Sequence, residues 1–130
     1  MQKDTRIDYW IELAEYDLET ARVMLEGRRY LYVGFMCQQV IEKALKAYFC
    51  LLFKEFPPHT HNLFNLAEKC QLLTILDEIQ IDLLGKLNPL NIEARYPSTK
   101  MELAKALNKE VCKELIDKTE DLFKWIKKRL

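Results

Sequence analysis

The chain has 130 residues, of which 49% are hydrophobic and 31% are charged, and it contains only three glycines and four prolines. This length fits one domain, residues 1–130, and leaves no room for a catalytic domain beside a separate cofactor domain. The 20 basic and 20 acidic residues balance, so net charge gives no support for specific duplex DNA or an anionic membrane as the main partner.

The cysteines are too far apart in the sequence to form a paired metal or redox motif. They are Cys37, Cys50, Cys70 and Cys112. We therefore expect no metal and no cofactor, and predict that the cysteines are small buried hydrophobic residues in a reducing compartment. The first residues lack the layout of a signal peptide, and the apolar run 47–53 is too short to cross a bilayer. The sequence predicts a cytoplasmic protein without a membrane segment.

The first half of the chain predicts two long helices. Residues 4–26 carry apolar side chains at alternating steps of four and three, which place them on one helical face. Gly27 follows where a C-terminal glycine cap would lie. A second helix is predicted over residues 30–55, and its apolar residues cover more than one face, which indicates a central position. Pro57 and Pro58 follow it, and proline does not continue a helix.

The second half predicts shorter helices and one more long helix. A short helix is expected over residues 62–71, and Thr74 can cap another that ends at Leu87. Ser98 is expected to begin a final long helix whose stripe includes Leu107. No alternating pattern indicates a strand. The prediction is an all-α, antiparallel up-and-down helical bundle resembling a four-helix bundle, with three long helices and a short helical pair.

Polar residues interrupt the apolar second helix at Gln38, Gln39, Glu42, Lys43 and Lys46. One interpretation is a solvated face with a Glu-to-Lys pair four residues apart, worth a few tenths of a kcal/mol. The other is a surface that meets another subunit or a ligand phosphate, and two adjacent glutamines in so apolar a helix favour it. On this interpretation, the first four residues form a subunit interface and the two lysines contact phosphate.

Three polar residues elsewhere have two interpretations each. Asp17 lies in the middle of the first helix, where an exposed position is favoured over pairing with a basic residue of a neighbouring helix. His59 and His61 have the spacing of a metal-binding pair. No carboxylate or thiol lies near them in the sequence, so capping and loop packing are favoured over metal binding.

Arg95 and Tyr96 place a cation beside an aromatic ring in a predicted loop. Arginine can bind a phosphate with two hydrogen bonds, and tyrosine can stack on a base. A loop arginine that holds helix ends together is an equal alternative. We predict a phosphate site where these residues approach His61 and Asn62, because a helix start offers unpaired amides to an anion.

The same residues carry a resemblance to a known family. Its motifs run in order along the chain: Ala14, Asp17, Leu18 and Ala21; Tyr30 and Phe35; Gln38-Gln39 with Glu42-Lys43-Ala44-Leu45-Lys46-Ala47; Thr60-His61-Asn62-Leu63; and Arg95-Tyr96-Pro97. With these motifs the chain resembles the HEPN domain (higher eukaryotes and prokaryotes nucleotide-binding), of the small stand-alone prokaryotic type. The resemblance implies a helical homodimer with a cleft near the subunit contact. It also implies pairing with a minimal nucleotidyltransferase, often as a toxin–antitoxin couple.

One departure from the wider superfamily concerns catalysis. Its ribonuclease members follow an arginine and a polar residue closely with a histidine, and this chain has no histidine beyond His61. Metal-independent RNA cleavage needs a proton donor or acceptor near neutral pH, which imidazole supplies. We therefore predict no catalytic residue. Three functions stay open: a nucleotide- or RNA-phosphate-binding homodimer, an atypical ribonuclease using Arg95 and His61, and a purely structural dimer.

Overall fold

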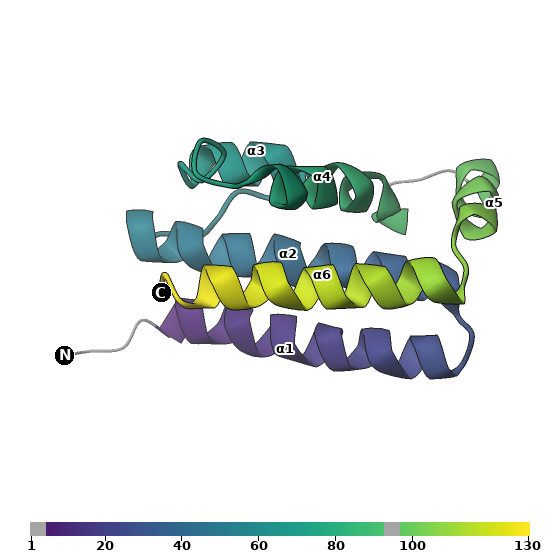
Figure 1. The fold of residues 1–130 in the computed structure, drawn as a ribbon. Coiled ribbons are helices and arrows are strands. Elements are labelled where there is room, and N and C mark those ends of the chain that lie inside the picture. The colour runs from purple at the N-terminus through teal and green to yellow at the C-terminus, as the bar shows by residue number, and fades with distance from the viewer. Residues whose placement is uncertain (1–4, 93–96) are drawn as a thin grey trace.

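The computed structural model describes residues 5–92 and 97–130. Its elements are α1 (Thr5–Glu26), α2 (Tyr30–Phe53), α3 (Leu63–Lys69), α4 (Glu78–Leu87), the 3-10 helix η1 (Asn88–Leu90), α5 (Pro97–Ala106) and α6 (Lys109–Lys127). No strand occurs within these described ranges, so the all-α prediction is confirmed. Figure 1 shows α1 running in one direction, α2 and α6 returning beside it, and α3 with α4 forming a further layer.

Helix α2 is the centre of the bundle, as its broad apolar surface predicted. It packs against α1 on one side, α6 on another, and α3 and α4 on a third. Val33, Val40, Ile41 and Leu45 are all buried within this environment. The breadth of the apolar surface is therefore accounted for inside one subunit, and it does not by itself require a second copy.

The turn between α1 and α2 differs from the predicted glycine cap. The left-handed residue is Arg28, with φ of 59°, whereas Gly27 has no positive φ. The amide of Arg29 donates to the Met24 carbonyl at 2.8 Å, and that of Arg28 donates to the Leu25 carbonyl at 3.1 Å. This pair of bonds places the left-handed position one residue after the glycine.

Helix α4 begins three residues later than Thr74 predicted. Asp77 caps it instead: its Oδ1 accepts from the Gln80 amide at 2.8 Å, and Gln80 Oε1 accepts from the Asp77 amide at 2.9 Å. This reciprocal capping box satisfies two amides at once, which a threonine at position 74 does not do. By contrast, α3 begins where predicted, with Asn62 Oδ1 accepting from the Asn65 amide at 3.1 Å.

The predicted single long helix from Ser98 is two helices, α5 and α6. Asn108 interrupts it, because its Oδ1 accepts from the Val111 amide at 2.9 Å and so starts a new helix. Leu107 is buried at the break. Figure 1 shows α5 set apart from α6 at the end of the bundle. A continuous helix with Leu107 facing inward would also turn Val111, four residues later, inward. In α6 Val111 is exposed instead, and Cys112 is buried.

Two glycines within helices lie in opposite surroundings, and this predicts opposite results for the same substitution. A Cβ at Gly85 meets only Phe64 Cζ, at 3.8 Å, whereas one at Gly34 lies 3.0 Å from Leu90 Cδ1 and 3.2 Å from Leu107 Cδ1. Gly85→Ala is expected to raise the free energy of unfolding by about 0.5–1 kcal/mol through helix propensity. Gly34→Ala is expected to lower it by about 1 kcal/mol, because overpacking exceeds that gain. Urea denaturation measures both, and shifts of equal sign would contradict the packing described.

The four cysteines are buried and form no disulfide bond, as predicted for small core residues. Burial raises the pKa of the Cys37 and Cys70 thiols to about 12 and that of Cys112 to about 11. These three thiols are therefore protonated and unreactive at neutral pH. Among the described helices, none combines the length and the apolar character needed to cross a membrane.

Candidate functional site

A row of polar side chains on α2 lies inside the bundle. Gln38, Glu42 and Lys46 are all buried, and the Glu42 side chain is only 4% exposed. Gln38 Nε2 donates to Glu42 Oε1 at 3.1 Å, and Lys46 Nζ donates to Glu42 Oε2 at 3.2 Å. The solvated-face interpretation is therefore wrong for these residues, since a carboxylate and an ammonium are held together away from water.

His61, just before α3, completes this group from a distant part of the sequence. Its Nδ1 lies 2.9 Å from Glu42 Oε1, and its backbone carbonyl accepts from Gln38 Nε2 at 3.1 Å. Gln39 Nε2 donates to Gln38 Oε1 at 2.8 Å. We refer to these five residues, which include Lys46, as the Glu42 cluster. It ties the segment before α3 to the middle of α2.

The imidazole of His61 is the part of the Glu42 cluster that reaches solvent. Its side chain is 50% exposed, although the carboxylate that it contacts is buried. Nδ1 faces Glu42, so Nε2 is the ring nitrogen left for another molecule, and it has no hydrogen bond to any described residue. A buried carboxylate thus fixes the orientation of a half-exposed imidazole, which can exchange protons or donate to an anion.

The two lysines predicted to contact phosphate are each already paired with a carboxylate. Lys46 Nζ lies between Glu42 and the ring of Trp10, 5.3 Å from the ring centroid. Lys43 forms an ion pair with Asp17 of α1. Asp17 is buried, so the exposed interpretation favoured for it is wrong, and its pairing across helices is confirmed. These lysines hold the bundle together and add little free positive charge to its surface.

The start of α3 has fewer free amides than the predicted phosphate site needs. Asn62 is exposed, but its Oδ1 already accepts from the Asn65 amide, and the Leu63 amide donates to Asn88 Oδ1 at 2.9 Å. Within the described part of the chain, the anion contact predicted here therefore depends on the His61 side chain. The other two predicted contacts, Arg95 and Tyr96, lie outside the described residues.

The residues predicted for a subunit interface divide into two groups. Gln38 and Glu42 are 0% and 3% exposed, so neither has surface to offer a second subunit. Gln39 and Lys43 are half-buried and keep part of their side chains at the surface. Sequence spacing revealed the row, but it did not distinguish contacts within one subunit from contacts between subunits.

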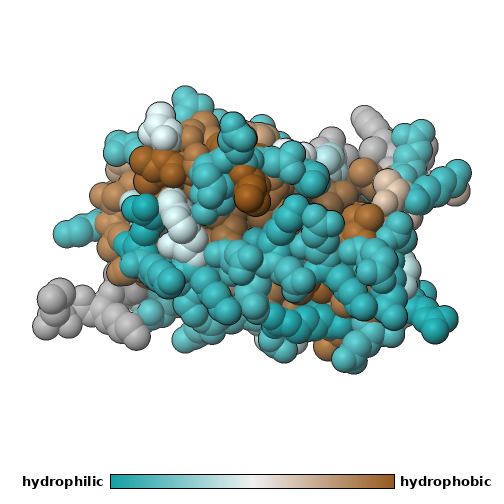
Figure 2. Space-filling model, in the orientation of Figure 1, coloured by the Kyte–Doolittle hydropathy of each residue, from teal (hydrophilic) through white to brown (hydrophobic). Residues whose placement is uncertain are grey.

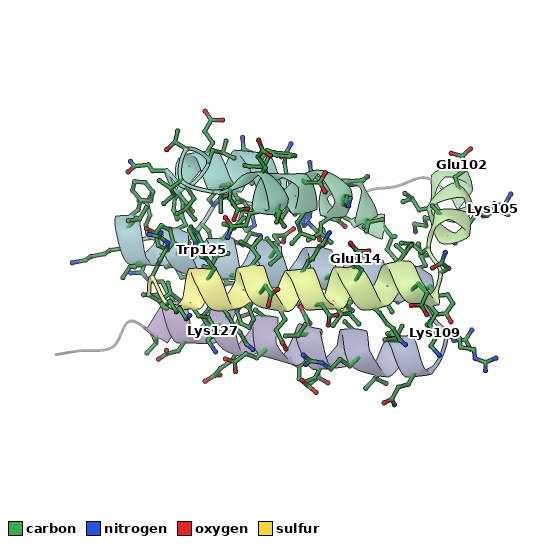
Figure 3. The ribbon with its side chains drawn as sticks, viewed as in Figure 1. Glu102, Lys105, Lys109, Glu114, Trp125 and Lys127 are labelled. Atoms are coloured by element: carbon green, nitrogen blue, oxygen red, sulfur yellow. The ribbon has the colours of Figure 1, made fainter. Side chains whose placement is uncertain are left out.

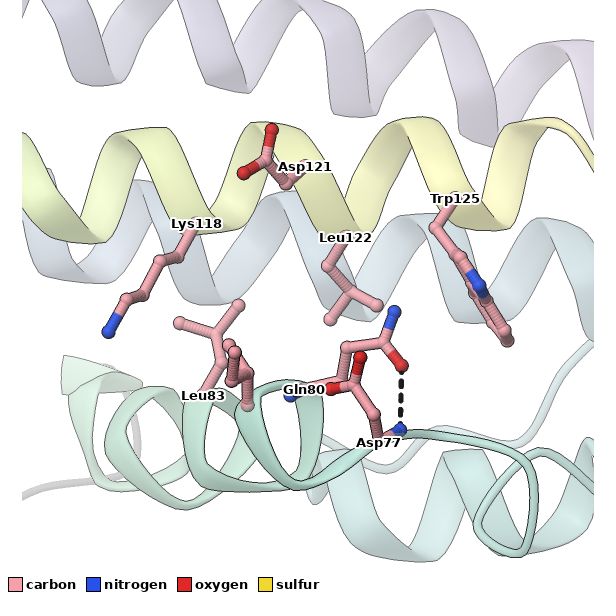
Figure 4. Close-up of a pocket in the computed structure, with 8 residues that line it drawn as sticks. Asp77, Gln80, Leu83, Lys118, Asp121, Leu122 and Trp125 are labelled. Atoms are coloured by element: carbon pink, nitrogen blue, oxygen red, sulfur yellow. Dashed lines mark hydrogen bonds between the residues drawn. The ribbon is translucent and has the colours of Figure 1, made fainter.

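The sequence interpretation missed a groove between α4 and α6. It has a volume of about 290 Å³ and is lined by Leu83, Leu122 and Trp125 together with Asp77, Lys118 and Asp121. Trp125 reaches from α6 towards α3 and α4 (Figures 3 and 4). Figure 2 shows hydrophobic side chains gathered around the layer that α3 and α4 form. Ile79 of α4 is 65% exposed.

Several polar groups near this groove have partners within the chain. Asp77 forms the α4 capping box, and the Arg129 guanidinium lies 4.1 Å from the Trp125 ring centroid. The groove shares no residue with the Glu42 cluster. Within residues 5–92 and 97–130, no three His, Cys, Asp or Glu side chains are arranged to hold a metal ion.

The comparisons with known proteins assign the family. The HEPN domain model matches residues 7–130, and the chain therefore belongs to the HEPN domain family. Two solved structures are similar to it over nearly their whole length. TT1696 from Thermus thermophilus has a TM-score of 0.80 and 22% identity, with 96% of this chain and 98% of that chain covered.

The second solved structure is ST0689, an archaeal HEPN homologue. It has a TM-score of 0.70 and 24% identity, with 99% of this chain and 98% of that chain covered. At these identities the two structures show the shared fold alone. No curated protein matches the sequence.

Proposed function

We propose that this HEPN chain binds a nucleotide or an RNA phosphate without cleaving it, as a homodimer that partners a minimal nucleotidyltransferase in a toxin–antitoxin-like pair. The observation that carries the binding proposal is the half-exposed His61 imidazole held by the buried Glu42 carboxylate. When both ring nitrogens are protonated, Nδ1–H donates to Glu42 and Nε2–H is free to donate to a phosphate oxygen. The dimer and the partner protein rest on membership of the family.

The charges around His61 set the expected strength of binding. Lys43 and Lys46 are neutralised by Asp17 and Glu42, and the whole chain carries no net charge. Among the described residues, a phosphate therefore meets few uncompensated cations near His61. We expect modest affinity that falls as salt concentration rises, because the remaining attraction is electrostatic.

The Glu42–His61 contact also supports one second candidate, a metal-independent ribonuclease. A carboxylate that orients an imidazole is a common arrangement for proton transfer, and His61 Nε2 is turned away from that carboxylate. Against it, the sequence lacks the superfamily arrangement of an arginine with a histidine close behind it. Binding without cleavage is therefore the first proposal, and cleavage is a distinct outcome of the same experiment.

The test measures binding and cleavage of a fluorescein-labelled single-stranded RNA in buffer containing EDTA. We expect anisotropy to report binding that weakens between about 50 and 200 mM salt, with no cleavage product on a gel. His61→Ala should weaken binding by about tenfold or more, because it removes the exposed donor. His59→Ala is the matched control, since His59 is also exposed and lies two residues away, and it should bind as the wild type does.

Arg95→Ala tests the predicted loop contact in the same assay. It should abolish binding while circular dichroism shows unchanged helical content. If the wild type binds neither RNA nor labelled nucleotide and Arg95→Ala unfolds, the loop only holds helix ends together and the binding proposal fails. EDTA-resistant cleavage that His61→Ala abolishes and His59→Ala retains would replace it with the ribonuclease.

A further inference from the structure

Helix α1 carries a row of uncharged side chains on its outer face. The members follow one another at steps of four, three, four and three: Tyr9, Leu13, Tyr16, Thr20 and Val23. We call this row the outer stripe. Tyr9 is 56% exposed, Tyr16 73% and Val23 61%. The Thr20 hydroxyl donates to the Tyr16 carbonyl at 3.0 Å, so the helix itself satisfies that polar group.

The outer stripe lies opposite the face of α1 that builds the core. Ala14, Leu18 and Ala21 are buried in the hydrophobic core. Figure 1 shows α1 along one edge of the bundle, with the other helices all on one side of it. Single exposed apolar residues are ordinary. Large side chains repeated every seven residues are the pattern of a helix that packs against a second helix. From Tyr9 to Val23 the stripe is about 21 Å long.

A row of acidic residues runs along one side of the outer stripe. Glu12, Glu19 and Glu26 follow it at seven-residue spacing, and all three are exposed. Glu19 pairs with Arg22, whereas Glu12 and Glu26 have no basic partner in the described part of the chain. The outer stripe is therefore an apolar surface with a row of negative charges along one side, which we call its negative border.

The negative border decides which occupant fits. If two copies packed their outer stripes together in antiparallel fashion, Glu12 of one would face Glu26 of the other, and the two Glu19 residues would face each other. Such like-charge contacts disfavour antiparallel self-association through this face. A helix with the same apolar spacing and lysine or arginine at its border would place opposite charges along the seam.

We propose that the outer stripe docks an amphipathic helix with a basic border, supplied by a different protein. This inference rests on the part of the proposed function that gives the chain a partner protein, and it names the surface and the chemistry of that contact. It is independent of the nucleotide contact at His61.

Two synthetic helical peptides test the proposal against the full-length protein. They share apolar residues at the four-three spacing and differ only in carrying lysines or glutamates at the border. Fluorescence anisotropy should show the lysine peptide binding about tenfold or more tightly than the glutamate peptide. Tyr16→Lys should weaken binding of the lysine peptide by about tenfold. Ile79→Lys, at a 65% exposed residue of α4, should leave it unchanged.

A charge-reversed variant provides the internal check. With Glu12→Lys and Glu26→Lys together, the protein should prefer the glutamate peptide. Equal binding of the two peptides, or binding of neither, would overturn the proposal. Sedimentation would also overturn it if the wild type were a dimer that Tyr16→Lys dissociates and Ile79→Lys leaves intact. The occupant of the outer stripe would then be a second copy of this chain. RNA binding by Tyr16→Lys should stay at the wild-type level, which separates failure of this surface from failure of the His61 site.

Discussion

Glu42→Ala is expected to lower the free energy of unfolding by about 3–5 kcal/mol, the usual cost of removing one partner from a buried ion pair. The Lys46 and Glu42 side chains are only 8% and 4% exposed. Removal of the carboxylate leaves the ammonium in the bundle without a counter-charge. It also removes one of the two acceptors of Gln38 Nε2 and the contact to the His61 imidazole. Urea denaturation followed by circular dichroism measures the change.

A second ion pair of the same spacing provides the control. Asp82 and Lys86 of α4 also lie four residues apart, at 3.0 Å, but their side chains are 61% and 52% exposed. Asp82→Ala should cost less than about 1 kcal/mol, because water screens an exposed pair. If Glu42→Ala costs no more than Asp82→Ala, the Glu42 cluster is not the buried structural element described above.

A double variant separates lost charge pairing from lost packing. Glu42→Leu combined with Lys46→Met leaves neither charge in the bundle, and buried pairs replaced by apolar residues often keep their stability. We expect this variant to recover most of what Glu42→Ala loses. Its RNA binding should nevertheless stay weaker than that of the wild type, because His61 no longer has the carboxylate that orients it. The double variant thereby separates the contribution of Glu42 to stability from its contribution to RNA binding.

The sequence was sufficient to predict the elements that depend on local patterns. The apolar periodicity of residues 4–26 and the broad apolar surface of residues 30–55 predicted α1 and the central α2 closely. The start of α3 at Asn62 was also predictable, because asparagine is a strong N-cap. Each of these features is set by residues within a few positions of one another.

The errors arose where local patterns permitted two answers. The stripe of the last predicted helix continued through Leu107. In the structure Asn108 caps a new helix directly after it, and Leu107 is buried beside α2. Thr74 and Asp77 are both acceptable caps. Asp77 prevails because Gln80 completes the capping box. Propensity alone does not decide between a continuous helix and one whose break improves tertiary packing.

The candidate site was predictable as a row of residues but not as a buried cluster. The four-residue spacing places Gln38 and Glu42 on one face of α2 without indicating whether that face meets water. Its burial depends on the chain returning over α2, which brings His61 to Glu42 from 19 positions away. The contact between Asp17 and Lys43 likewise joins two helices across 26 positions. No local pattern encodes such contacts.

Lys43→Glu is expected to lower the free energy of unfolding by about 2–4 kcal/mol. The substitution removes the ion pair with Asp17 and places two carboxylates together between α1 and α2. The Lys43 and Asp17 side chains are 18% and 12% exposed, so water screens their repulsion only in part. Thermal unfolding followed by circular dichroism measures the loss of stability.

The reversed pair shows whether Lys43 also contributes to a subunit interface. Asp17→Lys combined with Lys43→Glu restores opposite charges between α1 and α2, so we expect it to recover more than half of the lost stability. It still reverses the charge that Lys43 presents at the surface. If the homodimer uses Lys43, sedimentation should show the double variant folded and dissociated. Full recovery of both stability and the dimer would limit Lys43 to its role within one subunit. Failure to recover any stability would mean that the contact with Asp17 does not join α1 to α2 as described.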